Sequence, residues 1–152
     1  MNRSDINTDM NDSAIETIYH EKMPVALIIP SGVSVDGISY ITDPLNSLQI
    51  GLHHRPAGMK LAAHTHIVPA PVSISEYQEV LYIISGSIEL TLYTTGGDII
   101  AKRTLNAGDS ALLIREGHQV TYLEETRMFE VKQGPYPGAS NAKLYLRETQ
   151  LT

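Results

Sequence analysis

The sequence of 152 residues has no cysteine, no tryptophan and only one phenylalanine. The absence of cysteine excludes disulfide bonds, catalytic thiolates, zinc fingers with cysteine ligands and iron–sulfur clusters held by cysteine. It also fits a protein that works in a reducing compartment, where disulfides are rare.

Basic residues are scarce as well. Eleven Lys and Arg residues stand against seventeen Asp and Glu residues, which gives a net charge of -6 and a pI near 5.4. A basic surface for nucleic acid is therefore not expected. No apolar stretch approaches the roughly 20 residues that cross a bilayer, and the chain does not start with an apolar signal segment. We predict a cytoplasmic protein without a nucleic-acid or membrane partner.

Long helical patterns are missing, and the chain instead shows short apolar segments separated by Gly, Pro, Asn and Asp. Turn signals at intervals of roughly 8–12 residues are typical of an antiparallel all-β sandwich or barrel. We expect strands at residues 25–29, 37–42, 48–54, 60–66, 80–84, 87–93, 99–105, 111–114, 118–123 and 128–133, with a short helical turn at 13–19 and a last strand at 143–148. Residues 1–13 are polar and predict a flexible N-terminal tail, and residues 14–152 predict one domain.

Three histidines stand at positions where they can share a metal ion. Residues two apart in a strand point to the same side, so His64 and His66 are expected to project together. Glu79 begins the next strand and can add an oxygen, and His118 starts a later strand and can add a third nitrogen. Such a set suits one divalent transition metal (Fe, Mn, Ni, Cu or Zn) and leaves coordination positions open, as catalysis requires.

These residues occur in two motifs that resemble those of the cupin superfamily. The first is Gly58, five residues, His64-Thr65-His66, then Glu79, six residues and Gly86; the second is Gly108-Asp109, an apolar segment, Gly117 and His118. The resemblance covers roughly residues 48–133, with the metal-site motifs within 58–118. It implies an antiparallel jelly-roll barrel, the double-stranded β-helix, in which His64, His66, Glu79 and His118 bind the metal. The chain's ending is similar to small cupins found near surface-polysaccharide and sugar-modifying genes.

Two features of the motifs leave alternatives open. Twelve residues separate His66 from Glu79, where the cupin motif has three or four. This insertion contains Glu76 and Gln78, and either can replace Glu79 as the oxygen ligand. The second motif lacks the usual proline and final asparagine, although His118 is the one histidine in that region.

Three further residues are candidates for substrate binding or proton transfer. Glu130 and Lys132 share one face of a late strand, where they can line a pocket or form a solvated ion pair. Tyr136, in the Gly- and Pro-rich segment that follows, can offer a phenol to a polar ligand. His53 and His54 are adjacent, so at most one of them can face the pocket.

Two classes of function follow from these patterns. The first is a metal-dependent enzyme that performs isomerase, epimerase or lyase chemistry on a small polar metabolite such as a sugar derivative, or a dioxygenase reaction if the metal is Fe(II). The second is a non-catalytic module that binds a small molecule. We also expect a homodimer, in which the N-terminal strands, residues 25–29 especially, can pair across a two-fold axis.

Overall fold

The computed structural model describes residues 14–66, 76–134 and 144–146. Within these residues the fold is all-β. The strands are β1 (Glu16–His20), β2 (Met23–Ile29), β3 (Gly37–Tyr40), β4 (Gly51–His54), β5 (Glu79–Ser85), β6 (Ser87–Tyr93), β7 (Ile99–Asn106), β8 (Ser110–Leu113), β9 (Gly117–Tyr122) and β10 (Arg127–Lys132). The prediction of an antiparallel all-β chain is therefore confirmed.

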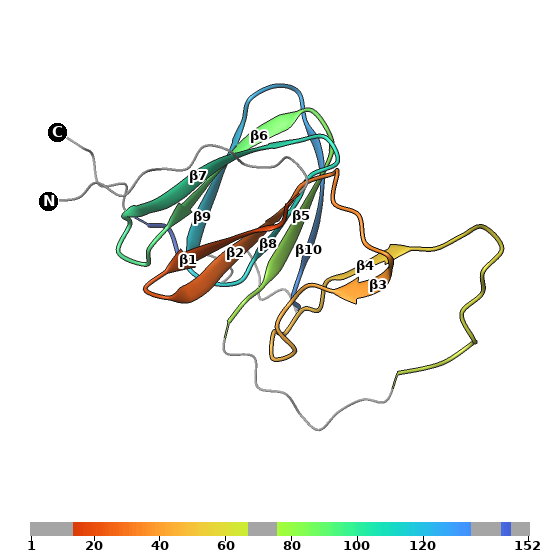
Figure 1. The fold of residues 1–152 in the computed structure, drawn as a ribbon. Coiled ribbons are helices and arrows are strands. Elements are labelled where there is room, and N and C mark those ends of the chain that lie inside the picture. Colours follow the sequence, from red (N-terminus) through yellow and green to blue (C-terminus); the bar gives the residue numbers. More distant parts are fainter. Residues whose placement is uncertain (1–13, 67–75, 135–143, 147–152) are drawn as a thin grey trace, which may run out of the picture.

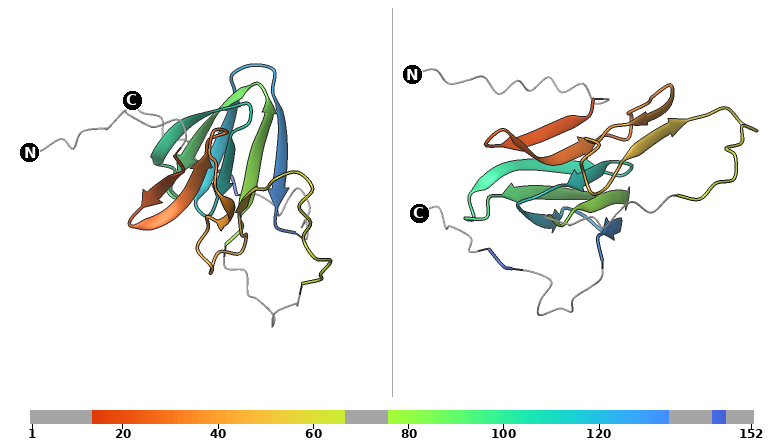
Figure 2. Two further views of the ribbon diagram at one scale, coloured as in Figure 1. Left: turned by 45° about the vertical axis from the view of Figure 1, so that its right-hand side comes forward. Right: turned by 90° about the horizontal axis from the view of Figure 1, so that it is seen from below.

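The strands form three antiparallel sheets, which Figures 1 and 2 show from three directions. One sheet has the order β1-β2-β8-β5-β10, the second has the order β7-β6-β9, and β3 pairs with β4 alone. Over the described residues the sheets stay separate and do not close into a barrel by hydrogen bonding. The five-stranded and three-stranded sheets instead face each other as a sandwich.

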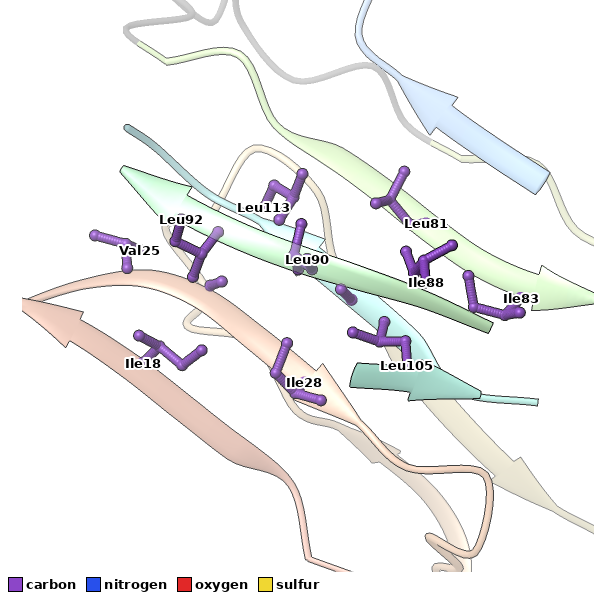
Figure 3. Packing of buried hydrophobic residues seen from close by; sticks show 12 residues of the cluster. Ile18, Val25, Ile28, Leu81, Ile83, Ile88, Leu90, Leu92, Leu105 and Leu113 are labelled. Atoms are coloured by element: carbon purple, nitrogen blue, oxygen red, sulfur yellow. The ribbon is translucent and has the colours of Figure 1, made fainter. Parts of the chain in front are cut away.

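The main core lies between these two sheets. Ile28 and Ile83 of the larger sheet meet Ile88 and Leu90 of the smaller one, and all four side chains are buried (Figure 3). Alternation at period two places these residues on the inner face and their neighbours on the outer face. A residue that lies on the same side of its strand as one of these core residues therefore belongs to the inner face.

A second cluster covers part of the outer face of the larger sheet. Leu27 of β2 and Leu112 of β8 are buried there under Ile41, Leu48 and Ile50, which come from the segment around β3 and β4. The larger sheet is thus covered on both faces over β2 and β8. This explains why residues 25–29 and 111–114 are almost continuously apolar.

Both edges of β2 are occupied, by β1 on one side and by β8 on the other. Pairing of residues 25–29 across a two-fold axis, as expected from the sequence, is therefore wrong, because that strand already pairs on both sides within the chain. The edge strands of the larger sheet are β1 and β10. The homodimer itself stays a prediction.

The N-terminal segment differs from expectation in a second respect. Residues 16–20 form β1 and not part of a helical turn, because Ile18 is buried in the main core and the segment pairs with β2. Residues 144–146, the described part of the expected last strand, are not in a strand. The expected tail at residues 1–13 lies outside the described residues, as does Tyr136.

Candidate functional site

Glu79 and His118 lie on the inner faces of the two opposing sheets. Glu79 is directly opposite Leu113 of β8, and His118 is directly opposite Leu92 of β6; both leucines belong to the main core. Because residues directly opposite in an antiparallel pair point to the same side, both polar side chains face the space between the sheets. The fold therefore brings a carboxylate and an imidazole from different sheets toward each other.

The two side chains meet loosely. His118 Nε2 lies 3.9 Å from Glu79 Oε1, and the side chains are 34% and 19% exposed. This separation exceeds the distance of a hydrogen bond. It is also wider than the roughly 3.0–3.4 Å expected between neighbouring nitrogen and oxygen ligands of one ion with bonds near 2.1 Å. The donor types fit a transition metal, and a small side-chain movement would bring them to ligand distance.

Lys132 and Glu130 share this inner face. In β10, Lys132 is directly opposite Glu79, and Glu130 is directly opposite the buried Leu81. Lys132 Nζ lies 2.9 Å from Glu130 Oε1, and both side chains are a little more than one-third exposed. We call Glu79, His118, Glu130 and Lys132 the inner-face polar group. The predicted catalytic candidates on β10 thus lie beside the predicted ligand Glu79.

His64 and His66 lie close to one another but outside the sandwich. Their ring centroids are 5.2 Å apart in an edge-to-face arrangement, and both side chains are exposed. The segment that carries them is not a strand, and Figures 1 and 2 show that it extends away from the two sheets. The strand on which their common direction was predicted is therefore absent, although the two rings do lie side by side.

The local geometry of the pair is compatible with metal binding. His64 Nδ1 lies 2.8 Å from the carbonyl oxygen of Ala62, to which it can donate, and this leaves Nε2 as the ligand atom. Two imidazoles on one ion have ring centres roughly 4.5–5 Å apart, given metal–nitrogen distances of 2.0–2.1 Å. The observed 5.2 Å is close to this, and it also suits a plain edge-to-face contact between the rings.

The four predicted ligands are not assembled in one place. Across residues 14–66, 76–134 and 144–146, no group of three or more His, Cys, Asp or Glu side chains is arranged to hold a metal ion. The fold instead brings the ligands together as two pairs, Glu79 with His118 and His64 with His66.

The alternative oxygen ligands have other partners. Gln78 is buried, and its Oε1 accepts a hydrogen bond of 2.9 Å from the backbone N–H of Leu48. Glu76 Oε2 lies 3.2 Å from Nη2 of Arg115. Gln78 thus fixes the segment around β3 and β4 to the start of β5, and Glu79 is the residue of the three that faces His118.

The glycines of the two motifs have structural roles. Gly86 and Gly108 both have positive φ, and a Cβ at Gly108 would lie 2.7 Å from Cβ of Ser31. Asp109, next to Gly108, accepts the backbone N–H groups of Ser31 and Asn106 at 2.9 Å each. The Gly108-Asp109 turn therefore anchors the start of β8. The four residues of β8 then lead to the turn before His118.

Lys102 and Arg103 have clear pKa shifts, and each forms an ion pair. A hydrogen bond and the charge of Glu89 raise the pKa of the exposed Lys102. The hydrogen bonds to Glu16 raise the pKa of Arg103, although partial burial opposes this. Both pairs are structural contacts between neighbouring strands or sheets.

The candidate residues from the sequence do not include Arg115. The structure places it beside Glu76, near the start of β5 where Glu79 lies. Its one sequence signal is its position in the turn of the second motif, three residues before His118. No helix within the described residues has the length and apolar character that spanning a membrane requires. Comparisons with family models, with curated proteins and with solved structures find no match for this chain.

Proposed function

We propose that the chain is a metal-binding protein of the cupin type, with a jelly-roll sandwich that holds one divalent transition metal at the inner-face polar group. The observation that carries this proposal is the contact between His118 and Glu79 across the two sheets. Both side chains are partly exposed beside an apolar core, so their nitrogen and oxygen donors are accessible to an ion from solvent.

His64 and His66 would supply the other two ligands. Their rings already lie side by side, and the hydrogen bond from His64 Nδ1 to Ala62 prepares its Nε2. Because metal-binding energy is coupled to the folding of the chain that supplies the ligands, binding would draw their segment toward the sandwich. When bound, such an ion polarises an oxygen of a small polar ligand.

Lys132 and Glu130 are the side chains best placed to act beside that ion. An ammonium group opposite Glu79 can hold a negatively charged or carbonyl oxygen, and the carboxylate of Glu130 can accept or return a proton. Isomerase, epimerase or lyase chemistry on a small polar metabolite such as a sugar derivative stays a prediction. An Fe(II)-dependent dioxygenase reaction and non-catalytic ligand binding also stay predictions, as does a cytoplasmic location.

Metal analysis of protein purified without an affinity tag tests the proposal. We expect about one transition metal ion per chain in the natural protein, and a loss of most of it in His118→Ala and in His64→Ala. His54→Ala, which removes an exposed histidine of β4, is the matched control and should keep the metal.

A content below about a tenth of an ion per chain, or equal losses in His54→Ala and His118→Ala, would refute the metal site. Lys132→Met then separates the two classes of function. An enzyme would keep its metal and lose turnover on a substrate that the natural protein converts. A binding module would lose ligand affinity and show no turnover with any candidate substrate.

A further inference from the structure

A surface hollow of about 380 Å³ lies at the end of the sandwich where β5 and β9 begin. Segments far apart in the sequence line it, and the residues are Met23, Glu76, Tyr77, Thr95, Arg115 and Glu116. Its volume suits a small polar metabolite. Because Gly117 begins β9 directly after Glu116, the hollow adjoins the strand that carries His118.

The guanidinium of Arg115 has poor partners in this hollow. Nη2 contacts one oxygen of Glu76 at 3.2 Å, and Nη1 contacts the thioether sulfur of Met23 at 3.0 Å. Nε is buried and has no hydrogen-bond acceptor among the described residues. A sulfur atom is a weak acceptor, and a buried donor without a partner is costly.

Arg103 shows what a satisfied guanidinium looks like in the same protein. Its Nε donates to one oxygen of Glu16 at 2.8 Å, and its Nη2 donates to the other. This two-point geometry is the preferred arrangement of arginine with a carboxylate or phosphate. Arg115 makes one of the two contacts, so its fork can still take a two-oxygen group.

One residue that lines the hollow, Glu116, has a positive φ. Glu21, Lys22 and Glu116 are the non-glycine residues with positive φ in the described chain, at 48°, 67° and 70°. Glu116 lines the hollow and Lys22 immediately precedes Met23, which also lines it. His20 Nδ1 lies 3.8 Å from Glu116 Oε1, which links the two turns. Such conformations are uncommon for these residues and cluster at ligand sites.

The carboxylate of Glu116 is held away from Arg115 by other partners. Its Oε2 accepts the backbone N–H of Thr95 at 2.8 Å, while its Oε1 faces His20. The negative charge that competes for Arg115 is therefore that of Glu76. To reach Arg115, an anionic ligand would need to displace Glu76 Oε2 from its contact with Nη2.

From these contacts we infer that Arg115 binds the oxyanion of a small metabolite, a carboxylate or a phosphate group, in this hollow and in place of Glu76. The inference rests on the hollow, the half-used guanidinium of Arg115 and the strained backbone of Glu116. It does not require the metal, so it can hold or fail independently of the proposed function.

Titration of the full chain, with metal removed by a chelator, tests this inference. Inorganic phosphate and succinate are the two probes, followed by amide NMR spectra and by the Nε–H signal of Arg115. We expect saturable shifts at Thr95 and Arg115, and the tighter probe identifies phosphate or carboxylate. Arg115→Lys should weaken binding by about tenfold or more, because lysine cannot form the two-point contact.

Two further variants decide the outcome. Glu76→Gln should tighten binding, because it removes the competing charge, and Arg127→Lys in β10 is the matched control that should leave affinity unchanged. If neither probe shifts the Arg115 Nε–H signal in a saturable way, the inference is wrong. It is also wrong if Arg115→Lys and Arg127→Lys reduce affinity equally, which would indicate non-specific attraction of anions.

Discussion

Replacement of Gly86 by alanine should destabilise the fold severely, although this glycine belongs to the motif that suggested a metal site. Gly86 has a φ of 82°, where a residue with Cβ is strained by about 1–2 kcal/mol. A Cβ there would lie 2.5 Å from Thr126 Oγ1 and 2.8 Å from Thr126 Cα, and it would overlap the carbonyl oxygen of Glu125. Because two of these atoms are backbone, a simple rotation of a side chain cannot relieve the overlap.

The overlap has a second consequence at the same turn. The Thr126 hydroxyl accepts the backbone N–H of Ser87 at 3.2 Å and donates to the carbonyl of Ser87 at 3.0 Å. Displacing Thr126 would break this exchange, and overpacking at a rigid site costs about 1–3 kcal/mol. Together with the backbone strain, we expect Gly86→Ala to lower the free energy of unfolding by about 3 kcal/mol.

Gly58→Ala is the matched control, because Gly58 has a nearly identical φ of 83° but no atom within 4 Å of the added Cβ. It should lose only the backbone contribution, about 1 kcal/mol. Urea denaturation followed by far-UV circular dichroism measures both values. If Gly86→Ala loses no more than Gly58→Ala, steric exclusion at the turn is not the reason for this glycine.

Two more predictions concern stability. The turn between β1 and β2 has Glu21 and Lys22 at positive φ, a geometry that Asn-Gly adopts far more readily. The double replacement Glu21→Asn, Lys22→Gly should therefore raise the free energy of unfolding, measured by urea denaturation, by about 1 kcal/mol. A lower free energy of unfolding would contradict the claim that the natural turn is strained. Arg103→Lys should cost about 0.5–1 kcal/mol, reduced by high salt, because its two-point contact with Glu16 is partly exposed. Pairing with Glu16 raises the pKa of Arg103, so the stability from this ion pair is complete below the ordinary pKa of arginine and is lost only as the pH rises through the raised pKa. A loss of this stability between neutral and mildly alkaline pH would contradict the reasoning.

Strands were predictable from the sequence wherever period-two alternation was bounded by strong turn residues. The predicted strand at residues 87–93 coincides with β6, because Ser85-Gly86 fixes its start and Thr94 to Asp98 close its end. β1 was missed because its one aliphatic residue, Ile18, shows no alternation of apolar and polar positions. Its extended form depends on pairing with β2 and on the burial of Ile18, which are distant interactions.

The candidate site was predictable one residue at a time and not as an assembly. Alternation with Leu81 places Glu79 on an inner face, and alternation with Val120 does the same for His118. That these two meet depends on the register of both sheets, which no local pattern contains. The pattern His64-Thr65-His66 has the period of a strand, but period alone does not supply a neighbouring strand to pair with, and the segment remains unpaired over its described residues.

Two ionic contacts between the larger and the smaller sheet differ in their geometry. Near one flank, Arg103 of β7 satisfies both oxygens of Glu16 of β1, so the pair is optimised for mutual attraction. Near the other flank, His118 of β9 faces Glu79 of β5 at 3.9 Å, and an ionic contact of that length stabilises a fold little. Both pairs lie on inner faces beside the same core, where apolar side chains would have served stability better. The pair of Arg103 and Glu16 is explained by holding the sheets together, whereas the pair of His118 and Glu79 is the place where we propose that a metal ion binds.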